Sequence, residues 1–202
     1  MKKIFTVLFL FFIIFNLSAQ NQSRLALVIG NENYDKGVLA NPVNDALLIA
    51  KTLDSLGFDV ILDTNINDQR SFIKRIREFG DRRGSYDVGF VYYAGHGVQI
   101  GGENYLLPTK ETFESEDDVE FNAVSVQSIM KYLTASTNQV NIMVLDACRD
   151  NPFEDNWSET TRSLGGKGSG LAKIPPPTGS LIAFSTDAGQ TADDGEGENS
   201  IY

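Results

Sequence analysis

One stretch of the chain, residues 140–150, constrains the fold more than any other. It reads VNIMVLDACRD, and its first six residues are mostly apolar, which is typical of a strand buried on both faces of a parallel sheet. Cys148 follows this run and is the single cysteine of the chain, so it forms no internal disulfide. Because open α/β sheets bind their ligands beyond the carboxyl ends of the strands, Cys148 is predicted to lie where such a sheet does its chemistry.

A second apolar run, residues 88–93, ends in the same way. It is followed by AGHG, and His96 in this motif is the single histidine. A cysteine and a histidine that each follow a core strand suit a nucleophile and the base that takes its proton. The alternatives are a buried, inert thiol and a hydrogen-bonded core histidine. The charged neighbours of Cys148 favour a reactive thiol, and the flanking glycines predict a loop around His96.

The first 19 residues are predicted to be a secretory signal peptide. Two lysines precede an apolar run over residues 4–15, and a small residue, Ala19, stands where a signal peptidase would cut. A membrane anchor is the alternative, but the run is shorter than the ~20 residues that a spanning helix needs. We therefore expect residues 20–202 to form one exported domain, periplasmic or secreted, that has no membrane association after cleavage.

The charge of the predicted mature chain is strongly negative. Removing the leader takes away two lysines and leaves 15 basic against 27 acidic residues, a formal net charge of −12. This charge argues against nucleic acids and anionic membranes as partners, and it favours cationic peptides.

Apolar runs that alternate with helical patterns indicate an α/β fold in which helices cover both faces of a mostly parallel sheet. Strands are expected at residues 25–29, 58–62, 88–93, 140–145 and 180–185, and helices at 42–56, 67–83 and 126–133. The glycine-rich segment 95–105 suits a hairpin. The acidic segment 111–120 lacks the glycine-centred pattern of a calcium loop, so we expect a solvated loop there and no metal site.

Residues 151–178 differ in character from the rest of the domain. The segment is rich in glycine and contains three consecutive prolines at 175–177, which predicts a long exposed excursion between strands. Its basic residues Arg162, Lys167 and Lys173 are candidates for self-cleavage, because a protease reaches such segments easily.

Several short motifs, taken together, resemble one family. They are LALVIG at 25–30, NY at 33–34, NDA at 44–46, YYAGHG at 92–97, DACR at 146–149 and IAFST at 182–186. In this order, and on the predicted strand ends, they resemble the caspase-like cysteine proteases, and within them the bacterial metacaspase-like branch. The spacing agrees, since His96 stands 52 positions before Cys148 and about 50 are expected in caspases.

The resemblance implies a caspase-like three-layer sandwich and a set of roles. Cys148 would be the nucleophile and His96 its base, and the backbone N–H groups of Cys148 and Gly97 would be the oxyanion donors. Glycines beside the histidine let the backbone approach the scissile carbonyl, which a side chain would block. No cofactor is implied, and activation by calcium stays open without a clear motif for it.

The motif around the cysteine departs from that of caspases, which have glutamine two positions before it and glycine two positions after. Here these positions hold Asp146 and Asp150. In metacaspase-like relatives, aspartates that match Asp146 and Asp45 line the primary specificity pocket, which implies cleavage after Arg or Lys. Alternatively, Asp45 only favours a helix dipole, and Asp146 only orients the loop after its strand.

The expected function is therefore that of an exported cysteine endopeptidase that cleaves peptides and proteins after Arg or Lys. Two alternatives stay open. One is an inactive or truncated caspase-like domain that acts as a binding or scaffold module. The other is a small-molecule-binding domain of flavodoxin-like topology, although Gly30 is followed by Asn31 and Glu32 rather than by a glycine-rich phosphate loop.

The end of the chain suggests an incomplete sheet. In caspase-like proteins a further helix and strand follow the last predicted strand, whereas here a polar loop leads only to Ile201 and Tyr202. We therefore expect the C-terminal part of the domain to be missing and self-association through an unpaired sheet edge. Alternatively, the shorter sheet suffices and these two residues cap it.

Overall fold

The computed structural model describes residues 22–134, 139–148 and 171–185. Seven strands form one sheet in this part of the chain: β1 (Arg24–Gly30), β2 (Phe58–Thr64), β3 (Val88–Ile100), β4 (Glu103–Leu106), β5 (Val124–Ser125), β6 (Val140–Cys148) and β7 (Ser180–Phe184). The helices are α2 (Pro42–Ser55), α3 (Gln69–Arg83), α4 (Glu116–Asn122) and α5 (Val126–Leu133).

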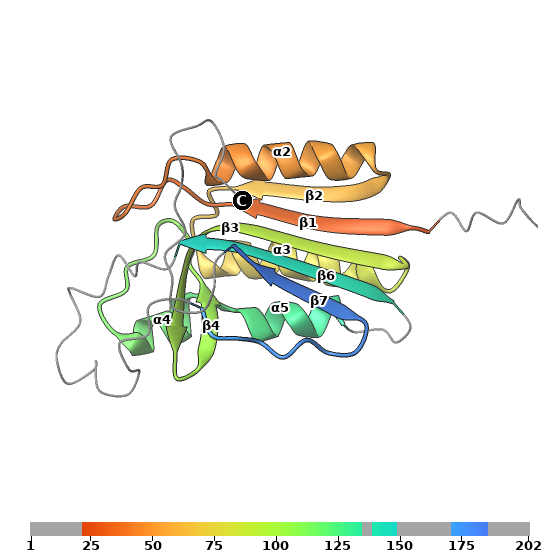
Figure 1. The fold of residues 1–202 in the computed structure, drawn as a ribbon. Coiled ribbons are helices and arrows are strands. Elements are labelled where there is room, and N and C mark those ends of the chain that lie inside the picture. The colour runs from red at the N-terminus through yellow and green to blue at the C-terminus, as the bar shows by residue number, and fades with distance from the viewer. Residues whose placement is uncertain (1–21, 135–138, 149–170, 186–202) are drawn as a thin grey trace, which may run out of the picture.

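The sheet is mostly parallel, as the sequence predicts. Its parallel part has the order β2-β1-β3-β6-β7, and the second half of β3 continues into an antiparallel extension with β4 and β5 (Figure 1). At the carboxyl edge of the parallel part, Gly30 pairs with Ala94, and Ala94 pairs with Asp146. The carboxyl ends of three neighbouring strands therefore lie in one row.

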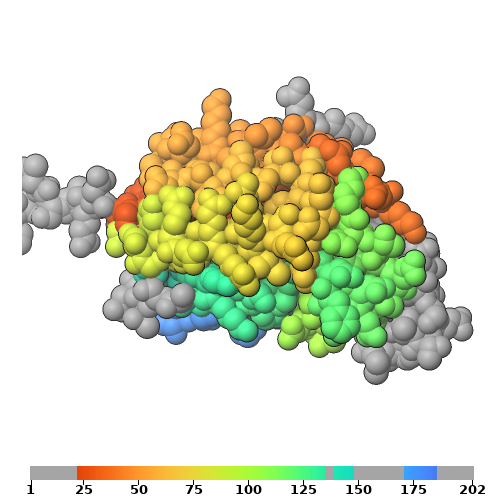
Figure 2. Space-filling model, turned by 180° about the vertical axis from the view of Figure 1, so that it is seen from behind, coloured from red at the N-terminus to blue at the C-terminus, as the bar shows by residue number. Residues whose placement is uncertain are grey.

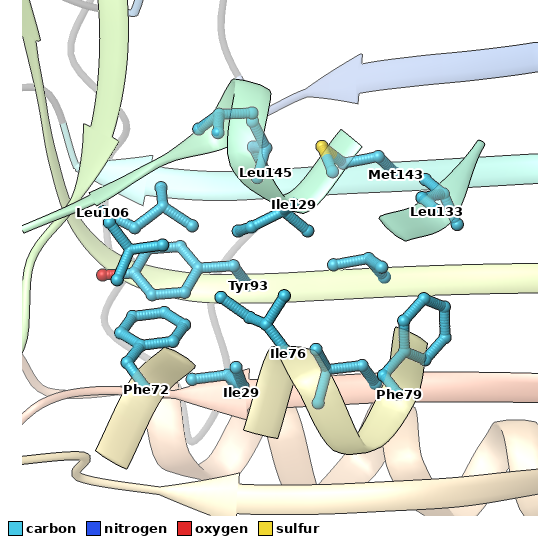
Figure 3. Packing of buried hydrophobic residues seen from close by; sticks show 14 of the residues in the cluster. Ile29, Phe72, Ile76, Phe79, Tyr93, Leu106, Ile129, Leu133, Met143 and Leu145 are labelled. Carbon is cyan, nitrogen blue, oxygen red and sulfur yellow. The ribbon is translucent and has the colours of Figure 1, made fainter. Parts of the chain in front are cut away.

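Helices cover both faces of this sheet. Helix α2 lies on one face, and α3 and α5 lie together on the other (Figure 1). The larger core fills the space between the sheet and the helices α3 and α5 (Figure 3). Its largest side chains include Phe72, Phe79, Tyr93, Ile129 and Leu145. A smaller core lies under α2 and contains Val28, Ala46 and Tyr92. The result is the expected three-layer arrangement.

The basic side of α3 faces away from the sheet. Phe72, Ile76 and Phe79 are buried beneath the helix, whereas Arg70 and Lys74 are exposed. Figure 2 shows the outer surface of α3, in yellow, from behind the molecule. The helix is amphipathic as its sequence predicts, with Arg70 and Lys74 on the solvent side, whereas Arg83 at its end is buried.

Helix α2 begins and ends where turn chemistry predicts. Pro42 occupies the first helical position, where its missing N–H costs no helical hydrogen bond. The Val43 N–H in the same turn donates to the carboxylate of Glu32 at 3.2 Å. Gly57, with φ of +78°, follows the helix, and this left-handed conformation suits glycine. The sequence did not identify Glu32 as a partner of this helix start.

The prediction of a solvated loop over residues 111–120 is wrong for its second half. Helix α4 begins at Glu116, and the Ser115 side chain accepts the Asp118 N–H. Three acidic residues in the first helical turn interact favourably with the helix dipole. Val119 is buried, so this short helix also contributes to the core.

The predicted loop around His96 is also wrong. Strand β3 continues through His96 to Ile100, because β6 pairs with it as far as His96 and β4 pairs with it from Gly97 onward. The expected hairpin over 95–105 is confirmed as the β3–β4 pair. Gly101 and Gly102 form its turn with φ of +57° and +86°, values that glycine adopts readily.

The segment predicted as an exposed excursion is only partly described. Residues 151–170, which include Arg162 and Lys167, lie outside the described residues. The remainder is not exposed throughout, because Leu171 is buried in the larger core. The buried side chain of Asn104 accepts the Ala172 N–H at 2.6 Å and donates to the Ala172 carbonyl at 2.8 Å. This stretch is therefore tied to the start of β4.

Strand β7 ends the described part of the sheet. Among the described residues it pairs with β6 alone. Leu181 within it is 60 % exposed. Pairing of this edge with a second copy stays a prediction. None of the described helices is long and apolar enough to cross a membrane. The predicted signal peptide, residues 1–19, lies outside the described residues.

Candidate active site

His96 and Cys148 are direct partners on neighbouring strands. They form the last pair of the parallel β3–β6 ladder, and adjacent strands lie about 4.8 Å apart. The fold therefore brings the predicted base and the predicted nucleophile together at the carboxyl edge of the sheet. The structure describes the main chain of Cys148, which is the last residue of β6.

The imidazole of His96 is buried and held in one orientation. The residue is 3 % exposed, and its Nε2 lies 2.6 Å from the carbonyl oxygen of Gly37. Because a carbonyl only accepts, Nε2 must carry the proton of this hydrogen bond. In the neutral ring Nδ1 then carries the lone pair, so it is the atom able to accept a proton.

The loop that supplies the Gly37 carbonyl is fastened at several points. The Asn65 side chain accepts the N–H groups of Glu32 and Asn33 at 2.9 and 3.0 Å. Lys110 donates to the Asn33 carbonyl at 2.8 Å and to the Asp35 carboxylate at 2.6 Å. Residues from two other connections therefore hold the loop that orients His96.

The sequence did not assign roles to Gly37, Asn65 or Lys110. Turn-forming residues after β1 indicated that a loop leaves the sheet at this edge, but no local signal specified its contact with His96. Asn65 has φ of +53°, a left-handed conformation that asparagine adopts more readily than most residues. The left-handed conformation of Asn65 cannot be predicted from the presence of one asparagine in a polar turn.

Asp146 and Asp45, the predicted specificity residues, lie on the side of the sheet that α2 covers. Asp146 accepts a hydrogen bond from the Tyr92 hydroxyl at 3.3 Å, and Tyr92 belongs to the core under α2. Asp45 lies in the first turn of α2. The two residues are 9 % and 6 % exposed, so both carboxylates are largely withdrawn from water.

The close packing of α2 on Gly30 places Asp45 near the row that contains Asp146. A Cβ at Gly30 would lie 2.4 Å from the Pro42 carbonyl oxygen and 2.7 Å from the Ala46 Cβ. Only glycine permits this approach of the first helical turn to the end of β1. Gly30 stands two strands from Asp146 in the same row, about 10 Å at ordinary strand spacing.

Gly97, a predicted oxyanion donor, follows His96 in β3 and pairs with Leu106. A Cβ at this position would lie 3.1 Å from Leu171 Cδ2 and 3.2 Å from Ala147 Cβ, which is tighter than ordinary contact. The surroundings therefore favour glycine here. The donor role of the Gly97 and Cys148 N–H groups stays a prediction.

The described residues contain no group of three or more His, Cys, Asp or Glu side chains that could hold a metal ion. A hollow of about 730 Å³ lies along the outer face of α3 and is lined by Arg70, Ile73 and Arg77, among others. That helix packs on the face opposite α2 (Figure 1), so the hollow is remote from Asp45 and Asp146.

The chain is similar to several known proteins. Residues 23–202 match the family described as the caspase domain. The human mucosa-associated lymphoid tissue lymphoma translocation protein 1 is 31 % identical over 140 residues, which cover 66 % of this chain and 16 % of that protein. Mouse caspase-12 is 24 % identical over 151 residues, covering 73 % of this chain and 35 % of that protein. The chain thus spans about a sixth to a third of the length of these curated relatives.

The crystal structure of caspase-1 from Spodoptera frugiperda has the same fold. It superposes with a TM-score of 0.60 at 20 % identity, over 89 % of this chain and 65 % of the insect chain. The likeness confirms the expected α/β fold with its mostly parallel sheet.

Proposed function

Because the chain belongs to the caspase domain family, we propose that it is a cysteine endopeptidase in which Cys148 is the nucleophile and His96 its base. The observation that carries this proposal is the pairing of the two residues at the end of the β3–β6 ladder. The alternative of a flavodoxin-like small-molecule-binding domain is not supported, because the family match covers the whole described fold.

The proposed reaction uses the tautomer that the Gly37 contact favours. His96 Nδ1 takes the thiol proton of Cys148, and the resulting thiolate attacks the carbonyl carbon of the scissile peptide bond. The Gly37 carbonyl, 2.6 Å from Nε2, then accepts a hydrogen bond from the imidazolium and stabilises its charge.

Attack on the carbonyl carbon places a negative charge on the carbonyl oxygen. The N–H groups of Cys148 and Gly97 are the donors we assign to this oxyanion. As the tetrahedral intermediate collapses, the peptide C–N bond breaks and the leaving amine takes the proton from His96. Water, deprotonated by the same ring, then hydrolyses the thioester and regenerates the thiol.

Asp45 and Asp146 are the residues we propose to select Arg or Lys at the cleaved position. Both carboxylates are largely buried on the α2 side of the site. A cation placed near two partly desolvated carboxylates is attracted, whereas an acidic side chain would cost several kcal/mol there. The negative net charge of the chain acts in the same direction.

Export and self-processing complete the proposal. Residues 1–19 would direct the chain out of the cytoplasm. In an exported protein an unpaired thiol such as Cys148 calls for an explanation, and the proposed catalytic role supplies one. Arg162, Lys167 and Lys173 carry the side chains that the proposed pocket accepts, so cleavage by a second copy of the enzyme would occur after them.

A peptide-cleavage assay tests the function. The purified protein is incubated with matched fluorogenic peptides that end in Arg, Lys or Asp before the reporter, with calcium and with a chelator. We expect release from the Arg and Lys peptides and none from a Cys148→Ala control. A folded protein that cleaves none of these peptides under either condition would favour the binding or scaffold module instead.

A further inference from the structure

His96 lies where β3 changes partners. The β1–β3 ladder ends at the pair of Gly30 with Ala94, and the β3–β4 ladder begins at the pair of Gly97 with Leu106. Gly95 and His96 fall between these two ladders. Backbone groups that lose a ladder partner in a buried site need another one, because an unpaired N–H or C=O is costly there.

Two tyrosine hydroxyls bond the main chain of His96 in this interval, and the Leu107 N–H also donates to the His96 carbonyl at 3.1 Å. The His96 N–H donates to the Tyr34 hydroxyl at 2.9 Å, and the Tyr93 hydroxyl donates to the His96 carbonyl at 2.7 Å. The two hydroxyl oxygens are 3.1 Å apart. Both tyrosines are buried, so water does not compete readily for these bonds.

The proton count of this cluster is consistent. Each hydroxyl has one proton to give, and that of Tyr93 goes to the His96 carbonyl. Tyr34 receives the His96 N–H and can give its own proton to the Leu107 carbonyl at 3.2 Å. Burial raises the pKa of Tyr93 well above its usual value, so this hydroxyl remains a donor at neutral pH.

Tyr34 also contacts the imidazole itself. Its ring centroid lies 4.4 Å from that of His96, with the two rings tilted by 56°. Gly37, three residues further along the same loop, holds Nε2. One loop therefore fixes both the main chain and the ring of the proposed base, while Tyr93 fixes the main chain from within β3.

We infer that Tyr34 and Tyr93 are positioning residues whose hydroxyls hold His96 in the orientation in which Nε2 bonds the Gly37 carbonyl and Nδ1 is left to act as the base. The inference rests on the proposed function, since it concerns the same base. Neither hydroxyl is assigned contact with substrate. Their effect is geometric, and a displacement of about 1 Å in a reacting group can cost on the order of 100-fold in rate.

Substitutions that remove only the hydroxyls test this role. In Tyr34→Phe and Tyr93→Phe the rings stay, so we expect kcat to fall about 10- to 100-fold while KM stays unchanged. Because the two hydroxyls act as one unit, the double variant should be hardly slower than the slower single variant. Tyr132→Phe is the matched control. Tyr132 packs against the larger core and lies beside Gly80 of α3, so this variant should keep wild-type kcat.

Single-residue probes make a test that needs no peptidase activity. His96 is the only histidine and Cys148 the only cysteine, so nitrogen-15 NMR of labelled histidine and alkylation by iodoacetamide each report one site. In the wild type we expect the Nε2–H tautomer and rapid alkylation at neutral pH. In both phenylalanine variants we expect mixed tautomers and an alkylation rate that reaches its maximum at higher pH.

The two kinds of measurement separate the inference from the proposed function. A wild type that cleaves no peptide, but whose tautomer and alkylation profile change on Tyr→Phe substitution, would refute the peptidase and support the positioning role. Folded Tyr34→Phe protein with the wild-type kcat, tautomer and alkylation profile would overturn the inference. If Tyr93→Phe fails to fold, Tyr34→Phe alone decides, because its ring sits in a loop rather than in β3.

Discussion

His96 and Cys148 stand opposite one another in the final pair that β3 and β6 form. A ladder pair fixes the distance and direction of two main chains far better than two loops would. The proposed base and nucleophile are therefore placed by the same hydrogen bonds that build the sheet, and their alignment depends on the stability of the central strands.

Removing either member of this pair should abolish hydrolysis. We expect Cys148→Ala and His96→Ala each to lose at least about 10³-fold in kcat, and the double variant to be hardly worse, because the two side chains carry out one step together. Circular dichroism should show that the fold persists. Substantial turnover of the Arg peptide by either single variant would refute the assignment of Cys148 as nucleophile and His96 as base.

Neutralising the carboxylates of Asp45 and Asp146 tests the proposed specificity pocket. Asp45→Asn and Asp146→Asn should each lower kcat/KM for Arg peptides by about 10-fold or more, since each removes one attraction to the cation. Asp54→Asn is the control, because Asp54 lies in the same helix but is exposed. Selectivity for Arg over Asp peptides that survives in both site variants would show that other residues form the pocket.

Gly95 is expected to tolerate no side chain. Its φ is +151°, and a Cβ there would lie 2.7 Å from the hydroxyl oxygens of both Tyr34 and Tyr93. Gly95→Ala should therefore displace the tyrosines, lower the free energy of unfolding by about 1–3 kcal/mol and reduce activity. Gly84→Ala is the matched control, since Gly84 has φ of −61° and open space around its Cβ position. Equal melting temperatures for the two variants would contradict the prediction.

Arg83 should matter for stability far more than its neighbour Arg82. Arg83 is fully buried and donates to the Tyr86 carbonyl at 2.5 Å and to the Asn141 side chain at 2.8 Å. Arg83→Met removes the donor to the Asn141 side-chain oxygen and leaves the Tyr86 carbonyl with the Gln139 side chain alone, so it should cost about 2–4 kcal/mol.

Arg82→Met serves as the comparison for this loss. Arg82 forms an exposed ion pair with Asp59 at 3.3 Å, and such surface pairs contribute at most about 1 kcal/mol. Urea unfolding followed by circular dichroism measures both variants. A loss of stability in Arg82→Met as large as that in Arg83→Met would count against the buried network.

Cleavage after Lys173 should depend on Asn104. The Lys173 side chain is exposed, but a protease needs extended backbone, and the Asn104 side chain holds both polar groups of Ala172. In a Cys148→Ala background, which cannot process itself, brief trypsin treatment should cut slowly after Lys173. Asn104→Ala should accelerate this cut relative to cuts after Arg162 and Lys167. Mass spectrometry of the fragments measures the ratio, and an unchanged ratio would show that Asn104 does not protect this bond.

Several elements were predictable because their signals are local. The strand over residues 58–62 and the helix that begins at Pro42 were found from apolar spacing and turn residues alone, and both are confirmed. Helix α4 was missed because its acidic first turn looks like a solvated loop. Its stability comes from the Ser115 cap and from Val119, which is buried by residues distant in the sequence.

The error at His96 has the same origin. Flanking glycines usually indicate a loop, but at Gly95 and Gly97 the small residue serves close packing inside a strand, against Tyr34 and Tyr93 on one side and Leu171 on the other. Leu171 itself was expected to be exposed. Beside it, Asn104 bonds Ala172, a contact between residues 68 positions apart, which no local pattern reports.

The sequence by itself determined that a lone cysteine and a lone histidine each belong to the end of an apolar core strand, because strand length and apolar spacing are properties of neighbouring residues. The tertiary structure alone decided that these two ends are register partners and that the Gly37 carbonyl holds the imidazole. It also decided that the hydroxyls of Tyr34 and Tyr93 meet at the main chain of His96. These contacts join groups up to 62 positions apart, and their geometry depends on strand register and side-chain direction, which emerge only when the sheet is assembled.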